Sequence, residues 1–130
     1  MKTMTTRFSA VSVLLLLAGS MSLLAAPNSA THTWKGYVTD TYCGFNRVNQ
    51  APTAKCTLEC VKDKHAKYAF FNFADKKVYI LNPQSEAAKY AGRTVEVRGT
   101  VVGRENFVTG KGPSSGAIIT ASSITPASSN

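Results

Sequence analysis

The stretch NPQSEAAKYAGRTVEVRGTVVG, residues 82–103, decides the fold because it joins a short helix to a half-buried strand. Its first half predicts the helix. Asn82 is expected to cap it, Pro83 suits its first position, Glu86 lies early in it and Gly92 ends it. The helix is therefore expected within residues 82–92.

The second half of the stretch, residues 93–103, alternates between apolar and polar side chains. Val95, Val97 and Val101 are expected to point into a core, and the residues between them toward solvent. Gly99 interrupts the strand and permits a bend. A half-buried strand is the prediction for this segment.

Further elements follow on either side of this stretch. Strands are predicted at residues 32–40, 67–73, 77–82 and 117–124, because β-branched and aromatic residues gather there. The strands at 67–73 and 77–82 form a hairpin whose expected core residues are Phe71, Phe73, Val78 and Ile80. A glycine-rich loop is expected at 103–116, with room for a short strand at 106–108.

A second helix is predicted at residues 53–63, starting at Pro52 and Thr53. Helical spacing puts one set of side chains on an inner face and another on an outer face. The inner set is Cys56, Thr57, Cys60 and Val61, and the outer set is Glu59, Lys62 and Asp63.

Five strands with a helix between the third and the fourth form the layout of the OB-fold, a partly open five-stranded barrel. The predicted fold class is mainly β with two short helices, a small OB-fold-like barrel over residues 32–125 followed by a flexible tail at 126–130. An SH3-like barrel and a plain antiparallel sheet with helices on one face are the alternatives.

The N-terminus has the pattern of a secretory signal peptide at residues 1–26. Lys2 and Arg7 precede an apolar run at 10–19, which is about half the length that a spanning helix needs, and small residues follow it. Cleavage is expected between residues 20 and 30. The sequence thus predicts export and no transmembrane anchor in the mature chain.

The chain is basic, with 15 Lys and Arg against 7 Asp and Glu. Removing Lys2 and Arg7 with the signal peptide leaves 13 against 7, a net charge of +6. This balance favours anionic partners such as a glycan, a lipid headgroup or an acidic protein, and export argues against nucleic acid. Candidates for a binding face on the barrel are Tyr68, Phe70, Tyr79 and Arg98, although aromatic residues that alternate in strands are more often core.

All three cysteines lie within residues 39–64. On a regular helix Cys56 and Cys60 have Cβ atoms about 5 to 6 Å apart, whereas a disulfide needs about 3.8 Å. Cys43 is therefore expected to pair with one of them. Such a structural disulfide contributes on the order of 3 kcal/mol to the free energy of unfolding in the chain-entropy model. It is the working interpretation for an oxidising compartment.

The alternative is a thiolate metal site in which Cys43, Cys56 and Cys60 together hold copper or zinc. Asp40 and His65 are the weaker candidates for a further ligand, His65 only if the helix ends before it. A spare thiol also allows thiol-disulfide exchange or a disulfide-linked dimer. No nucleophile elbow, P-loop or His-Glu-x-x-His run is present, so an enzyme is not the expectation.

Several of these segments occur together in a pattern that resembles a family of small secreted bacterial proteins of unknown function. The resemblance covers residues 34–124. It rests on Asp-x-x-Cys-Gly at 40–44, Cys-x-x-x-Cys-Val at 56–61, Ala-Lys-Tyr at 66–68 and the Val-x-Val-x-Gly-Thr-Val strand at 95–101. It implies an OB-like barrel and a periplasmic or secreted location, without an activity. Relatives with a histidine three residues before the second cysteine differ from this chain, which has Thr53 there.

Overall fold

The computed structural model describes residues 29–47 and 50–128. The predicted signal peptide, residues 1–26, lies outside these residues. In chain order the elements are β1 (His32–Asp40), the 3-10 turn η1 (Gly44–Asn46), α1 (Ala54–Asp63), β2 (Tyr68–Asn72), β3 (Val78–Asn82), α2 (Gln84–Ala88), β4 (Thr94–Thr109) and β5 (Gly112–Pro126). No helix among the described residues is long and apolar enough to cross a membrane.

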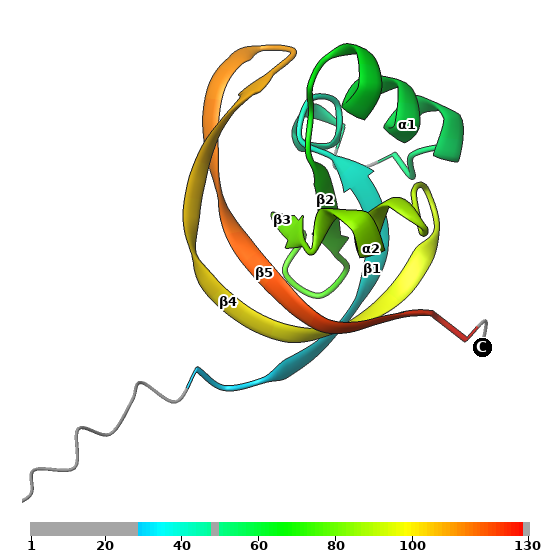
Figure 1. Cartoon of the computed structure of the whole chain (residues 1–130), viewed down its shortest axis with the longest axis vertical. Coiled ribbons are helices and arrows are strands. Elements are labelled where there is room, and N and C mark those ends of the chain that lie inside the picture. Colours follow the sequence, from blue (N-terminus) through cyan, green and yellow to red (C-terminus); the bar gives the residue numbers. More distant parts are fainter. Residues whose placement is uncertain (1–28, 48–49, 129–130) are drawn as a thin grey trace, which may run out of the picture.

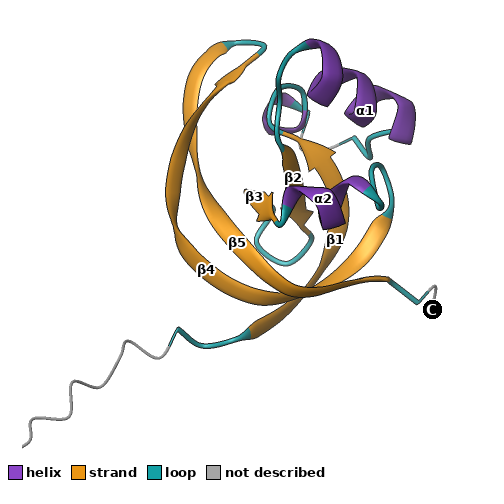
Figure 2. Cartoon of the chain, viewed as in Figure 1, coloured by secondary structure: helices purple, strands orange, loops and turns teal. Residues whose placement is uncertain are grey.

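The strands form one sheet that closes on itself in the order β1-β2-β3-β5-β4, with β4 pairing back to β1 (Figures 1 and 2). Neighbouring strands are antiparallel except β3 and β5, which are parallel. Helix α2 connects β3 to β4. The predicted fold class, a mainly β, OB-fold-like barrel of five strands, is confirmed.

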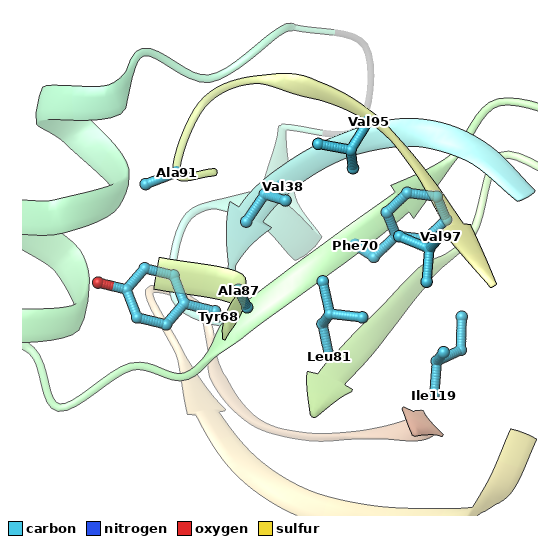
Figure 3. Close-up of a cluster of buried hydrophobic side chains, with 9 residues drawn as sticks. All are labelled: Val38, Tyr68, Phe70, Leu81, Ala87, Ala91, Val95, Val97 and Ile119. Carbon is cyan, nitrogen blue, oxygen red and sulfur yellow. The ribbon is translucent and has the colours of Figure 1, made fainter. Parts of the chain in front are cut away.

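The barrel core is built from the inward-facing side chains of the strands, from α2 and from the turn that follows it (Figure 3). It consists of Val38, Tyr68, Phe70, Leu81, Ala87, Ala91, Val95, Val97 and Ile119. Phe71 and Val78 lie in a second cluster with Tyr37 and Ala69, against which Phe73 packs. The core positions predicted at Phe71, Val78 and Ile80 are buried, and Phe73 is half-buried.

The prediction of a glycine-rich loop at residues 103–116 is wrong, because β4 and β5 continue through this segment as a hairpin. They pair from Arg104 with Ala117 to Thr109 with Gly112, and Gly110 and Lys111 form the turn. We call residues 104–116 the hairpin arm, because in this segment the two strands pair only with each other. Gly103 and Gly112 have φ of +131° and +114°, so these glycines serve a bulge and the turn of a strand pair.

Gly99 is needed for a close approach between strands. A Cβ at this position would lie 2.3 Å from the Thr120 carbonyl oxygen. The pairing register also shifts between Arg98 and Gly99 and again between Val101 and Arg104. Burial alternates along β4 from Val95 to Gly99 and stops there, and Val101, predicted to point inward, is 43% exposed.

The start of α2 also differs from the prediction. Asn82 is the last residue of β3 and pairs with Thr120, so it does not cap the helix. Pro83 occupies the N-cap position, and its carbonyl accepts from the amides of Glu86 and Ala87. At the other end of the chain β5 continues through Pro126, and the Ala127 amide donates to the Thr94 carbonyl.

Candidate metal centre

Two of the cysteines lie on the inner face of α1. The helix begins as predicted, with the Thr53 hydroxyl accepting from the Cys56 amide at 3.1 Å. Thr57 and Cys60 are buried, Cys56 and Val61 are half-buried, and Glu59, Lys62 and Asp63 are exposed. The Cys60 carbonyl accepts from the amides of Lys64 and Ala66, which holds the last turn of the helix.

The third cysteine follows the end of β1 and is positioned by Asp40. The Asp40 side chain is 1% exposed, and its Oδ1 atom accepts from the Tyr42 amide at 2.8 Å and the Cys43 amide at 2.7 Å. A carboxylate that accepts from amides two and three residues ahead folds the chain into a tight turn. This turn brings Cys43 back over α1.

The three sulfur atoms meet between these two elements. The Cys60 thiol donates to the Cys43 sulfur at 3.3 Å, and the Sγ atoms of Cys43, Cys56 and Cys60 all lie within 4.8 Å of one another. All three cysteines are free thiols. We refer to this group as the thiol cluster.

Burial raises the pKa of the Cys60 thiol, and the hydrogen bond with Cys43 and the Asp40 carboxylate raise it further. Cys60 is 8% exposed. Its thiolate is therefore disfavoured unless a positive charge comes close to it. A cation bound among the three sulfurs supplies that charge, and coordinated thiols lose their protons.

The two weaker ligand candidates lie differently. The helix α1 ends before His65, which is the condition under which His65 could have served as a metal ligand. However, the His65 side chain is exposed, and its nitrogen atoms are not among the ligand atoms that lie within 4.8 Å of one another. Asp40 is also outside that group, although it lies close enough to raise the pKa of Cys60. Within the described residues the thiol cluster thus offers three protein ligands.

The hairpin arm packs against the turn that carries Cys43. The Gly110 amide donates to the Tyr42 carbonyl at 3.1 Å, and the rings of Phe45 and Phe107 lie 4.5 Å apart. Lys67 forms an ion pair with Glu105 of the arm. These contacts link the arm to the segment between β1 and β2 that carries the cluster. Figure 1 shows the tip of the arm at the same end of the molecule as α1.

A pocket of about 260 Å³ opens beside the thiol cluster. Cys43 and Cys56 form part of its wall, and Cys60 does not. The other residues around it are Thr39, Asp40, Gly44, Arg47, Gln50, Ala51, Pro52 and Thr53. Two of the three cysteines of the cluster therefore border the pocket.

The binding face proposed on the barrel is not formed as predicted. Phe70 is 0% exposed and Tyr68 is 9% exposed, so both belong to the core and neither can stack on a ligand. Tyr79 lines a separate pocket of about 380 Å³ with Phe45, Lys77 and Arg104. Arg98 is exposed on β4, where it pairs with Thr33 and Ser123, and does not line that pocket.

Sequence reasoning missed the residues that complete the pocket, among them Arg47, Gln50 and Ala51. They lie in the connection between Cys43 and α1, where no periodic pattern is present. It also missed the role of Asp40 as the acceptor of the turn. The Asp-x-x-Cys spacing carries that signal, because aspartate commonly bonds to amides two or three residues ahead.

Comparisons with family models, with curated proteins and with solved structures found no match to this chain.

Proposed function

We propose that this protein binds one soft metal ion, Cu(I) or Zn(II), through Cys43, Cys56 and Cys60. The observation that supports the proposal is the placement of three free sulfurs within 4.8 Å of one another. An ion about 2.3 Å from each sulfur separates tetrahedral thiolates by about 3.8 Å, so small adjustments would close the site around it. Both ions favour thiolate ligands.

The proposed site is largely preorganised. The turn at Asp40 fixes Cys43, and the regular spacing on α1 puts Cys56 and Cys60 on one face. Folding thus brings the three sulfurs together before any ion binds. The conformational entropy lost on binding should be correspondingly small.

We also propose that the protein works outside the cytoplasm, in the periplasm or after secretion. This rests on the signal-peptide pattern formed by Lys2, Arg7 and the apolar run at 10–19. A basic surface would favour anionic glycans, lipid headgroups or acidic proteins there.

Native mass spectrometry of the reduced protein tests metal binding. Zn(II) is added in one arm, and Cu(I), kept reduced under anaerobic conditions, in the other. One retained ion per chain is expected, with at least tenfold weaker binding in Cys43→Ser, Cys56→Ser and Cys60→Ser. Leu58→Ser, at an exposed position of the same helix, is the matched control and should bind normally. Equal retention by the cysteine variants and the control would contradict the proposal.

A second candidate is supported by the 3.3 Å contact between Cys60 and Cys43. Oxidation of this pair would give a structural disulfide in an exported binding module and leave Cys56 free. The loop it closes is worth about 3 kcal/mol in the chain-entropy model. The intact mass and the free-thiol content of the purified mature protein separate the two functions. A protein with the structural disulfide is lighter by two hydrogens and has one titratable thiol, whereas a protein with the metal site has three titratable thiols after the ion is removed.

A further inference from the structure

The barrel is open at the point where β3 and β5 come together. The two strands pair only from Ile80 with Ile118 to Asn82 with Thr120. Before this point β3 pairs with β2 and β5 pairs with β4, so the two strand edges that face the opening are not joined to each other. A pocket of about 380 Å³ lies at the opening. Its lining residues are Phe45, Lys77, Val78, Tyr79, Arg104, Ser115, Gly116 and Ala117.

Two cations line this pocket, and no acidic residue of the described part of the chain does. The Arg104 guanidinium donates through Nη2 to the carbonyl and hydroxyl oxygens of Ser115, at 3.2 and 3.1 Å, so it lies against the wall of the pocket. A guanidinium has three more N–H donors on Nε and Nη1, and these have no partner among the described residues. The Lys77 ammonium forms no ion pair with those residues either.

The wall of the pocket also contains two aromatic residues. The Phe45 ring lies against β5, where a Cβ on Gly116 would be 2.9 Å from the tip of the ring. Tyr79 is half-buried, and its hydroxyl donates to the Asp75 carboxylate. Ligand pockets of about 300 to 1,000 Å³ typically combine aromatic and apolar walls with a few polar groups that orient the ligand. The pocket at this opening has that composition, and its volume suits one ring-sized group.

We propose that this pocket binds a six-membered ring that carries one carboxylate. The planar fork of Arg104 matches the two oxygens of a carboxylate, and Lys77 adds a second positive charge. The ring of the ligand packs against Phe45 and Tyr79. Sugar acids of anionic glycans and aromatic acids share this chemistry. The inference does not depend on the metal site, because this pocket and the one beside the thiol cluster have no lining residue in common.

NMR titration of the isotope-labelled protein tests the site with four probes. Methyl glucuronide and benzoate each carry a ring and a carboxylate, methyl glucoside has only the ring, and acetate has only the carboxylate. At least one of the two ring acids should give saturable shifts of the Tyr79 and Gly116 amide signals. It should bind about tenfold more tightly than methyl glucoside and acetate. The ring acid that binds more tightly identifies the source as a sugar acid or an aromatic acid.

Two substitutions test the cations, each with a matched control. Arg104→Gln should weaken binding of the better ring acid about tenfold, and Lys77→Gln about threefold. Arg98→Gln, on the same strand, and Lys111→Gln, in the turn of the hairpin arm, make the same changes outside the pocket and should bind like the parent. All four side chains are exposed, so the variants should fold normally.

Several outcomes would overturn this inference. Equal affinity for acetate and the ring acids would show that the ring is not recognised, and equal affinity for methyl glucoside and methyl glucuronide, with no benzoate binding, would show that the carboxylate is not. Shifts confined to residues outside the pocket, or equal binding by Arg104→Gln and Arg98→Gln, would also contradict it. None of these results bears on the thiol cluster, whose metal binding is measured separately by native mass spectrometry.

Discussion

Individual hydrogen bonds determine whether the three sulfurs meet. Cys43 depends on the Asp40 carboxylate, and Cys56 depends on the Thr53 cap at the start of α1. Both bonds join a side chain to a backbone amide close by in sequence. The geometry of the cluster is therefore set locally, by two turns of chain that the barrel holds next to each other.

Replacing Thr53 tests the cap. Thr53→Ala removes the acceptor for the Cys56 amide and should lower the free energy of unfolding by about 1 kcal/mol. Urea denaturation measures the change. Thr53→Ser keeps a hydroxyl acceptor and should be within a few tenths of a kcal/mol of the parent. If both variants are equally stable, the cap has no energetic role.

The raised pKa of Cys60 predicts a loss of stability at alkaline pH in the reduced, metal-free protein. Burial keeps the thiol protonated in the folded state above its ordinary pKa of 9.0, whereas the unfolded chain ionises there. The unfolded state then binds fewer protons, so the free energy of unfolding falls as pH rises, by up to about 1.4 kcal/mol per pH unit. Below pH 8 this contribution is constant.

Urea denaturation at pH 8, 9 and 10 measures this slope. Cys60→Ser carries no thiol at the buried position, and its stability should fall less steeply than that of the parent. Cys56→Ser is the matched control, because Cys60 remains in place. Identical slopes in the parent and Cys60→Ser would contradict the assignment to this thiol.

The candidate site could be predicted only in part, and for a physical reason. Helical spacing is a local property, so Cys56 and Cys60 could be placed on one face of α1 from the sequence. The nearness of Cys43, and its contact with Cys60 in preference to Cys56, depends on how β1 lies against α1. The pocket depends on the connection from Cys43 to α1, whose sequence has no periodicity.

At the scale of elements, the strands of the barrel differ from the hairpin arm in whether one of their faces is buried in the core. Barrel strands have one face in the core, so their alternation is visible in the sequence, as at Val95 and Val97. The arm has no core beneath it and is rich in glycine and serine, which is why its sequence resembles a loop. Its pairing is maintained by the turn and by contacts with Phe45 and Lys67.

Phe107→Ala tests the attachment of the arm. It removes the ring that packs on Phe45 and should loosen the arm from the Cys43 turn. Hydrogen exchange of the Gly110 amide, which donates to the Tyr42 carbonyl, should become at least several times faster. Val108→Ala changes a neighbouring side chain that is 64% exposed and serves as the control. Equal exchange in the two variants would show that the rings do not anchor the arm.

Phe70→Ala tests the barrel core. Phe70 on β2 is 0% exposed and is among the largest fully buried side chains. Its truncation should cost about 3 to 5 kcal/mol, measured by chemical denaturation. Val102→Ala, at a position 51% exposed, should change stability by no more than about 0.5 kcal/mol. A Phe70→Ala variant as stable as Val102→Ala would contradict the placement of this ring.

At the scale of the whole molecule, an ion that binds only the folded state should raise the free energy of unfolding of the whole domain. At a free ion concentration 100 times the dissociation constant the gain is about 2.7 kcal/mol, which for a domain of this size raises Tm by roughly 10 to 20 °C. Calorimetry of the reduced protein with and without Zn(II) measures the shift. A chelator should reverse it, and Cys56→Ser should show little of it. A Tm that does not respond to the ion would count against the metal site.

The closure of the barrel has a consequence for how the chain folds. The pairs β1 with β2 and β2 with β3 join neighbours in the sequence, but β1 with β4 and β3 with β5 join strands far apart. The entropy of closing these long loops must be lost before their contacts form. We therefore expect refolding in milliseconds to seconds, with the β1-β2-β3 meander ordering first and the parallel β3 with β5 pair last.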